Sequence, residues 1–380
     1  MRRAGVLAGK LRYGRAGEIP RAHLSQGVAC RGGRGGGRRG KETRVRGAQR
    51  VYPHRGRGAL GRGETPQFLP RRHFGDEPRF VLSADGRRKN RNLQTGKERV
   101  LKKTKVIIPA KINLTLDLLG VNGGYHELES LVASIDVVDA VTVFPKKSGE
   151  IGLRTKGIPC RCPKEKNNAY KAAQAFFAEH DGSADIVIEK NIPLGGGLGG
   201  SSADAAGVLK ALGIMYGEKK ENTERLAESV GSDVKYMLSG GYAVMRGRGE
   251  RVEKIESGLS LPLLVLVSDY PVKTAECYRL CDELGLCPVN GTAKAVKSLL
   301  SGDTAALKAS LFNGMTEAAK RLNGQISGNL AALESAGGAA AMSGSGGTTF
   351  AVFETETERD CAYRKLFPAF GDKLIKCKTI

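Results

Sequence analysis

The sequence predicts an α+β protein in which two folded domains follow a basic segment without a core. Three observations lead to this prediction. Patterns typical of strands and helices alternate irregularly from residue 104 onward, a glycine-rich loop stands directly before a helical run, and nearly all of the net charge lies before residue 104. We expect a disordered extension at 1–103, a first domain at 104–258 and a second domain at 259–380.

The first segment is rich in arginine and glycine. Residues 1–103 hold 28 lysines and arginines against 7 acidic residues, a net charge of +21 out of +22 for the whole chain. Apolar residues are sparse there and show no period, so we expect disorder. A nucleic-acid-binding arm is one interpretation. A transit peptide is disfavoured because only Ser25 and Ser83 occur. We favour translated upstream sequence from a misplaced start, with the true start near Val100 or Leu101.

The rest of the chain is almost neutral and contains no apolar run long enough to cross a membrane. Eight cysteines without a secretory signal indicate reduced thiols and a cytoplasmic protein. Cys277 and Cys281 would share one helix face, where we expect core packing rather than metal binding. No metal site is predicted from the cysteines, and we expect a monomer or a homodimer.

The first domain is predicted to be rich in strands. Residues 105–119 indicate strand, turn and strand, and Asn113, Thr115 and Asp117 alternate with apolar residues as in a half-buried strand. Asn122-Gly-Gly124 predicts a turn. The further elements expected are a strand at 131–144, a helix at 167–180, a strand at 184–189, a helix at 223–230 and a hairpin made by 240–245 and 251–255.

The second domain has a different order of elements. We expect a strand at 263–268, a helix at 274–284, short helical runs within 292–335, a glycine turn and strand within 339–353, a helix at 356–366 and a strand at 373–378. This order is typical of a ferredoxin-like α+β domain.

Residues 192–209, IPLGGGLGGSSADAAGVL, are the clearest local signal. Five glycines lie between residues 195 and 200, where the lack of a Cβ permits positive φ and close approach of a ligand. Ser201 or Ser202 is expected to cap the helix that follows. Free N–H groups at a helix N-terminus form an anion site, usually for phosphate.

Better-known phosphate loops do not match this stretch. It lacks the Gly-Lys-Ser/Thr ending of a Walker loop, and no acidic residue stands at the distance that a dinucleotide site requires. A flexible linker is also disfavoured, because linkers do not lead into a capped amphipathic helix.

Four separated motifs occur along the chain. They are Pro109-Ala-Lys-Ile-Asn113, the glycine loop, Gly231-Ser-Asp-Val234 and Met342-Ser-Gly-Ser-Gly346. In this order they resemble the GHMP kinase superfamily, small-molecule kinases that use a glycine-serine loop in place of a Walker motif. The resemblance covers about residues 104–380. It implies a two-domain fold, in which a domain like domain 2 of ribosomal protein S5 precedes a ferredoxin-like domain.

The segment Gly-Tyr-His-Glu-Leu128 makes the chain most similar to one branch of the superfamily. That branch phosphorylates the 2-hydroxyl of 4-diphosphocytidyl-2-C-methyl-D-erythritol with ATP in the non-mevalonate isoprenoid pathway. Two alternatives remain open. The first is a kinase of the homoserine or mevalonate type, whose substrate has no base for Tyr-His to hold, and the second is an RNA-binding protein that acts through the basic arm.

The resemblance implies a catalytic pair. Asp233 would take the proton of the substrate hydroxyl, and Lys111 would lie beside it and keep it ionised. Taken alone, Asp233 would more often be a helix cap or a turn carboxylate than a catalytic base. Mg²⁺ is expected with ATP near Ser201 or Ser202, although no carboxylate cluster in the sequence fixes it.

Binding residues follow from the same resemblance. Asn168 would lie near the adenine, Tyr125 and His126 would hold the cytosine, and Asn113 and Thr274 would contact the methylerythritol end. The ATP phosphates would be wrapped by Pro193, Leu194, Gly195, Gly196, Gly197, Leu198, Gly199, Gly200, Ser201, Ser202 and Ala203.

The chain also departs from the pattern of this branch. Gly124 replaces the usual aspartate before Tyr-His, and Lys235 and Gly347 each replace a usual proline. We expect these differences to change local loop geometry, not the phosphate loop or the catalytic pair.

Overall fold

The computed structural model describes residues 101–160 and 162–380. All of them belong to one structural unit, Arg91–Ile380. The predictions for the basic segment, including its disorder, its nucleic-acid partner and the misplaced start, concern residues outside those described.

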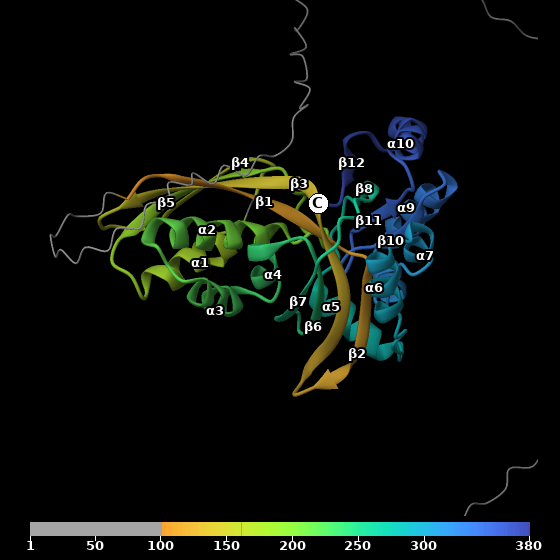
Figure 1. The fold of residues 1–380 in the computed structure, drawn as a ribbon, viewed down its shortest axis with the longest axis horizontal. Helices are drawn as coiled ribbons and strands as arrows, with labels where there is room; N and C mark the ends of the chain where they lie inside the picture. Colours follow the sequence, from red (N-terminus) through yellow and green to blue (C-terminus); the bar gives the residue numbers. More distant parts are fainter. Residues whose placement is uncertain (1–100, 161) are drawn as a thin grey trace, which may run out of the picture. The chain divides into compact units, whose positions relative to one another are not determined.

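The larger sheet is organised around one long strand, β3 (Tyr125–Lys146). Its first part pairs with β2 and β6 and its last part with β5, while β1 spans the middle and the end; all four pairings are antiparallel. Figure 1 shows β1 and β3 running together along the sheet. The other strands of this sheet are β1 (Thr104–Asn113), β2 (Thr115–Asn122), β4 (Gly152–Gly157), β5 (Ser183–Lys190), β6 (Tyr242–Gly247), β7 (Arg251–Ile255) and β9 (Phe312–Asn313).

One helix, α2 (Gly200–Tyr216), packs directly on β1 and β3 and is buried on most of its surface. Gly207 permits this close approach, since a Cβ there would lie 2.6 Å from Val141. The helices that contact α2 are α1 (Asn168–Phe177), α3 (Lys220–Val230) and α4 (Val234–Ser239) (Figure 1). The short helix η1 (Lys164–Lys166) contacts α1.

The smaller sheet is antiparallel with strand order β10-β11-β8-β12. This order confirms the predicted ferredoxin-like domain, because the first and last strands lie side by side. Its strands are β8 (Pro262–Val267), β10 (Ala339–Met342), β11 (Thr348–Val352) and β12 (Leu374–Lys378). Its helices are α5 (Thr274–Glu283), α6 (Thr292–Ser301), α7 (Thr304–Lys308), α8 (Thr316–Leu322), α9 (Gln325–Ser335), α10 (Glu356–Phe370) and η2 (Gly371–Lys373).

The two sheets are joined by more than the chain connection between β7 and β8, where the predicted boundary falls. The short strand β9 comes from the second half of the sequence but pairs in parallel with β2 of the larger sheet. The domain boundary at residue 258 therefore stays a prediction. The second half of the chain contributes strand β9 to the larger sheet.

The prediction of a half-buried strand at the end of β1 and in β2 is wrong. Asn113, Thr115 and Asp117 are all buried, because the second half of the chain covers their face. The Asp117 carboxylate accepts a backbone N–H bond from Val289 at 2.8 Å, and the Thr115 hydroxyl lies 2.9 Å from that of Thr292. Polar residues alternate here because they have polar partners, not because they face water.

The predicted core role of two cysteines is confirmed. Cys277 and Cys281 lie buried on α5 in a hydrophobic cluster. Burial raises the pKa of the Cys277 thiol to about 12, so it carries no thiolate at neutral pH. Within 101–160 and 162–380, no helix is long and apolar enough to cross a bilayer.

Candidate active site

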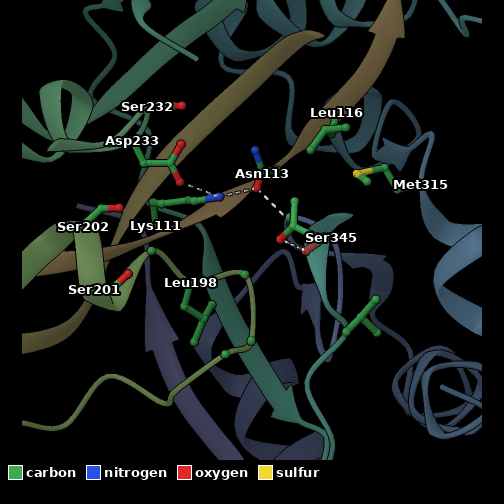
Figure 2. A pocket seen from close by; sticks show the side chains of 18 of the residues that line it. Lys111, Asn113, Leu116, Leu198, Ser201, Ser202, Ser232, Asp233, Met315 and Ser345 are labelled. Atoms are coloured by element: carbon green, nitrogen blue, oxygen red, sulfur yellow. Dashed lines mark hydrogen bonds and ion pairs between the residues drawn. The ribbon is translucent and has the colours of Figure 1, made fainter. Parts of the chain in front are cut away.

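A cavity of about 790 Å³ lies between the loop after β5, the β2–β3 and β6–β7 hairpins and the start of α5. Figure 2 shows its central side chains. The structure brings nearly all of the predicted site residues to this one cavity, although they are spread over 160 positions of the sequence. Those that line it are Lys111, Asn113, Tyr125, His126, Asn168, Pro193, Leu194, Gly195, Gly196, Gly197, Leu198, Gly199, Gly200, Ser201, Ser202, Asp233 and Thr274.

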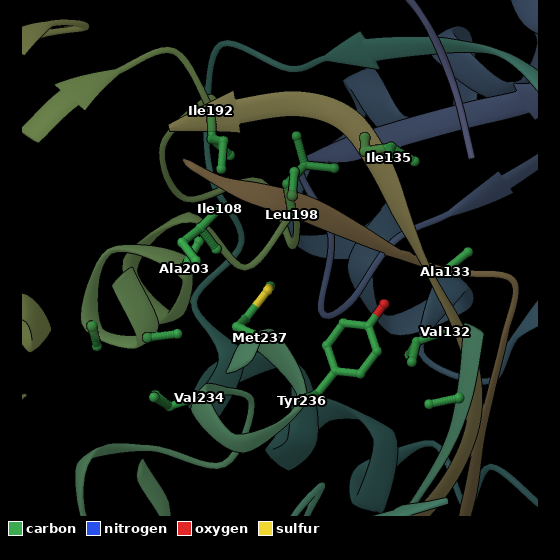
Figure 3. Packing of buried hydrophobic residues seen from close by; sticks show 14 of the residues in the cluster. Ile108, Val132, Ala133, Ile135, Ile192, Leu198, Ala203, Val234, Tyr236 and Met237 are labelled. Carbon is green, nitrogen blue, oxygen red and sulfur yellow. The ribbon is translucent and has the colours of Figure 1, made fainter. Parts of the chain in front are cut away.

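Ala203 is the exception among the predicted residues. It is fully buried and does not line the cavity. Figure 3 shows its side chain among Ile108 and other core residues behind the loop. Its position follows from helical geometry, since the residue after the two serines of the first turn points back to the sheet.

The backbone of the glycine loop adopts a conformation that residues with a Cβ rarely adopt. Gly195, Gly197 and Gly199 have φ values of 67°, 77° and 73°, in the left-handed region. Gly199 is also the N-cap of α2, so the prediction that Ser201 or Ser202 caps this helix is wrong. The left-handed turn at Gly199 starts the helix two residues earlier than a cap at Ser201 would, and it places both serines in the first turn.

This arrangement leaves polar groups at the start of α2 available to a ligand. No described side chain caps α2, and no hydrogen bond of the described residues involves the hydroxyls of Ser201 and Ser202. Both serines line the cavity, Ser201 exposed and Ser202 partly so. A helix N-terminus with uncapped N–H groups and two hydroxyls is suited to phosphate.

The second half of the chain packs closely against this loop. A Cβ at Gly197 would overlap the carbonyl oxygen of Ser343, and a Cβ at Gly196 would overlap the hydroxyl of Thr348. The Ser343 hydroxyl donates to the Gly197 carbonyl at 2.9 Å. The glycines are therefore required by packing as well as by φ.

Lys111 and Asp233 form an ion pair at the wall of the cavity. The Lys111 side chain is 6% exposed, and its Nζ lies 3.8 Å from Oδ2 of Asp233. Asp233 does occupy the N-cap position of α4, but its side chain makes no capping hydrogen bond. Its carboxylate is 34% exposed and faces Lys111 instead (Figure 2). The Asp233 side chain therefore does not cap α4, and its role as the catalytic base stays a prediction.

Asn113 connects this pair to the second half of the chain. Its Oδ1 accepts from Lys111 Nζ at 2.6 Å and from the Gly344 backbone N–H at 2.9 Å. Its Nδ2 donates to the Ser130 hydroxyl at 2.8 Å. Thr274 begins α5 and shares a hydrogen bond of 2.9 Å with Ser345. Asn113 thus links Lys111 to the segment 343–346, and Thr274 links the start of α5 to the same segment.

Aromatic and basic side chains form the other end of the cavity. Tyr125 is 58% exposed, and the Arg248 guanidinium carbon lies 4.7 Å from its ring centroid. His126 stacks on Tyr278 with ring centroids 4.5 Å apart, and its Nε2 lies 2.7 Å from Asp282 Oδ1. Burial raises the pKa of the Tyr278 phenol to about 12, so it remains protonated.

Several lining residues were not predicted from the sequence. Tyr278 follows Thr274 by four positions, which places both on one face of α5, so helical spacing gave a usable signal. Arg248 is the one basic residue inside the predicted hairpin turn Gly247-Arg-Gly249, a second usable signal. Ser345 belongs to Met342-Ser-Gly-Ser-Gly346, one of the four motifs that carry the family resemblance, but the serine itself was not predicted to line the site.

The fold and this cavity define a class of protein. A carboxylate beside a buried ammonium faces a helix N-terminus with free N–H groups and hydroxyls. These are the parts needed to transfer a phosphoryl group from a nucleotide to an alcohol, since such transfer depends on positioning and charge stabilisation. The class is that of small-molecule kinases without a Walker loop.

Comparison with known proteins identifies the family. Residues 167–245 match the GHMP kinases N terminal domain, and residues 295–373 match the GHMP kinases C terminal domain. A 4-diphosphocytidyl-2-C-methyl-D-erythritol kinase of Pelotomaculum thermopropionicum is 38% identical over 263 residues, 67% of this chain and 91% of the relative. The corresponding kinase of Syntrophomonas wolfei is 34% identical, over 66% of this chain and 89% of the relative.

A solved structure agrees with these relatives. The crystal structure of a 4-(cytidine 5'-diphospho)-2C-methyl-D-erythritol kinase has a TM-score of 0.61 and 30% identity, and covers 73% of this chain and 99% of its own. The chain belongs to the 4-diphosphocytidyl-2-C-methyl-D-erythritol kinase family of the GHMP kinases, and it is an ATP-dependent small-molecule kinase. Likenesses to a mevalonate kinase at 16% identity and a homoserine kinase at 20% show the shared fold alone.

Proposed function

We propose that this protein transfers the γ-phosphoryl group of ATP to the 2-hydroxyl of 4-diphosphocytidyl-2-C-methyl-D-erythritol, a step of non-mevalonate isoprenoid precursor synthesis. The observation that carries the proposal is that one cavity joins a phosphate loop, a Lys–Asp pair and an aromatic wall with a cation. The curated relatives named for this reaction support it.

The reaction is an in-line displacement at phosphorus. The substrate hydroxyl oxygen bonds to the γ-phosphorus, the bond to the β–γ bridging oxygen breaks, and ADP leaves. The hydroxyl proton passes to Asp233, and Lys111 stabilises the negative charge that develops on the attacking oxygen. The start of α2 stabilises charge on the phosphates through its free N–H groups.

The nucleotide would extend along the glycine loop. Residues 193–202 would surround its phosphates, and Asn168, at the start of α1, would lie near its adenine. Mg²⁺ usually keeps several waters and takes few protein ligands beside the phosphates. The hydroxyls of the exposed Ser201 and the partly exposed Ser202 fit this donor set and would hold the ion. When bound, Mg²⁺ would neutralise phosphate charge.

The alcohol substrate would occupy the other arm of the cavity. Its flat cytosine suits the wall of Tyr125, His126 and Tyr278, because rings stack on rings. Arg248 has no ion pair with a carboxylate of the described residues and would face the diphosphate. Asp282 would orient His126 toward the base edge. The methylerythritol end would contact Asn113 and Thr274.

The test is ADP release by the full-length protein with ATP, magnesium and 4-diphosphocytidyl-2-C-methyl-D-erythritol. Homoserine and mevalonate replace the substrate in parallel reactions. We expect turnover with the cytidine substrate alone, and a loss of about 10³-fold in kcat in Asp233→Asn, within the usual range for removal of a general base.

The matched control is Asp360→Asn. Asp360 is a partly exposed carboxylate on α10 outside the cavity, so this variant should keep wild-type turnover. Turnover with homoserine or mevalonate instead would show that the aromatic wall was misinterpreted. Asp233→Asn at the wild-type rate would remove the aspartate from the mechanism.

We also infer a cytoplasmic enzyme, because ATP is its phosphoryl donor and the described cysteines are unpaired thiols. A monomer or a homodimer stays the prediction for its assembly. Gel filtration with light scattering would distinguish them.

A further inference from the structure

A buried group of three charged side chains lies beneath the glycine loop, outside the cavity. Lys190 at the end of β5 is 2% exposed, Asp139 on β3 is fully buried and Asp204 on α2 is 5% exposed. The Lys190 Nζ donates to Asp139 Oδ2 at 2.5 Å and to Asp204 Oδ2 at 2.7 Å. None of the three lines the cavity, so the proposed reaction does not use them directly.

The contacts of this Lys190 cluster are made with the two ends of the loop. Asp139 Oδ1 accepts the backbone N–H groups of Asn191 at 2.6 Å and Ile192 at 2.8 Å, where the chain enters the loop. Lys190 Nζ donates to the Gly200 carbonyl at 3.0 Å, where the chain leaves it. The cluster thus contacts the two residues that precede the loop and the last glycine of the loop.

The packing leaves little space for a side chain at Gly200, where the chain leaves the loop. A Cβ at Gly200 would lie 3.0 Å from Lys190 Nζ. A side chain at Gly200 would therefore crowd both the lysine ammonium and the Ile192 Cγ2 atom, which lies at the same distance. The backbone of α2's first residue and the lysine are fitted to one another.

Burying these charges is an expensive way to obtain stability alone. A buried ion pair is often no more stabilising than apolar residues of the same volume. Asp204 Oδ1 is buried without a hydrogen-bond partner among the described residues, and burial raises the pKa of this carboxyl to about 7. Lys190 and Asp139 are thus the pair whose contacts reach the loop backbone, and Asp204 is the less well satisfied member.

We propose that Lys190 and Asp139 are positioning residues for phosphoryl transfer, which hold the two ends of the glycine loop at the separation that aims its N–H groups at the ATP phosphates. The inference rests on the proposed function in that ATP is the ligand of this loop. It predicts that damage to the cluster weakens ATP binding more than binding of the alcohol.

The experiment measures binding of ATP with magnesium to the full-length protein by calorimetry, with KM for both substrates and Tm. Asp139→Asn places an amide N–H against the lysine, and Lys190→Arg keeps the charge but moves the donors. We expect each to weaken ATP binding at least tenfold while KM for the alcohol changes less than threefold. Asp204→Asn, whose amide oxygen can still accept from Lys190, should stay within threefold of wild type for both.

The matched control is Arg359→Lys. Arg359 is 8% exposed, pairs with Glu356 and Asp360, and lies in the second half of the chain away from the loop. It should lower Tm without changing ATP binding. Asp139→Asn and Lys190→Arg proteins that have a lower Tm but bind ATP like the wild type would overturn the inference and leave a structural role. Wild-type protein that does not bind ATP would overturn the proposed function instead.

If Asp139→Asn fails to fold, Lys190→Arg decides the question, because it preserves the buried charge. Lys190→Arg with wild-type ATP affinity would refute the positioning role. Lys190→Arg with weakened ATP affinity and unchanged affinity for the alcohol would support it.

Discussion

Gly197→Ala tests the contact between the two glycine segments. Gly197 has φ 77°, a region in which an L-residue with a Cβ costs about 1–2 kcal/mol. Its new Cβ would also overlap the Ser343 carbonyl oxygen and lie 2.8 Å from the carbonyl carbon and 3.2 Å from Gly344 Cα. These are backbone atoms, which cannot rotate away, and overpacking of this kind costs roughly 1–3 kcal/mol more.

Gly302→Ala supplies the comparison. Gly302 follows α6 with φ 70°, and nothing lies within 4 Å of its Cβ position. It should therefore lose only about 1–2 kcal/mol, the cost of the left-handed backbone. The difference between the two variants isolates the contact between the loop and the segment around Ser343, and we expect it to be about 2 kcal/mol.

Urea unfolding of both full-length variants gives the free energies, and ADP release gives the kinetics. Gly197→Ala should also raise KM for ATP at least tenfold, since the loop must move away from Ser343. Gly302→Ala should keep wild-type KM. Equal unfolding free energies for the two variants, together with an unchanged KM for ATP in Gly197→Ala, would refute the close packing on which this prediction depends.

Three further predictions concern charges and rings. Lys111→Met should lower kcat about 10³-fold, and the double variant with Asp233→Asn should be little worse than either single one, because the two act as a unit in a kinetic assay. Asp204 has a native pKa raised to about 7 from an ordinary 3.8. The native state then binds more protons between these values, so the free energy of unfolding should fall as pH rises from about 4 to 7, by at most about 4 kcal/mol. Urea titrations at several pH values should show a flatter profile for Asp204→Asn; the same slope in both proteins would contradict the assignment. Tyr125→Ala should raise KM for the cytidine substrate roughly tenfold or more and leave KM for ATP unchanged, whereas an equal rise in both would place the tyrosine elsewhere in the mechanism.

Local backbone geometry could be predicted where only one residue type fits it, as glycine does at positive φ. The glycines of the loop indicated positive φ and close approach, and the structure has both at Gly197. The ferredoxin-like order of the second sheet followed from the order of strands and helices. The pairing of Lys111 with Asp233 was predicted only from the resemblance of their motifs to the family, because no sequence periodicity relates residues so far apart.

Two of the failures share a physical cause, which is that the partner of a polar group lies far along the chain. Asp117 looked solvent-facing because its partners, the N–H groups of Val289 and Asn290, come from another element. The Lys190 cluster was missed for the same reason. A lysine at the end of a strand is usually exposed, and only the tertiary fold shows the two aspartates around it.

The prediction of a serine cap was wrong for a different reason. Gly199, in the same loop, takes the N-cap position instead of either serine. Ser201 and Ser202 are good capping residues, and sequence preference favoured them. A left-handed glycine starts the helix at Gly200, and this position is fixed by Lys190 on one side. The hydroxyls that would have satisfied the helix are thereby left facing the cavity.

The glycine loop is held from two independent directions, and this has a consequence for how the site works. The Lys190 cluster holds its ends from within the first sheet, and Ser343 holds Gly197 from the second half of the chain. Asn113 then joins Gly344 of that same segment to Lys111 through one carbonyl oxygen. A shift of the segment around Ser343 would therefore move the phosphate loop and the lysine of the catalytic pair together. In the proposed reaction, one piece of backbone would in this way align the donor phosphate and the acceptor hydroxyl, while the Lys190 cluster would position the loop alone.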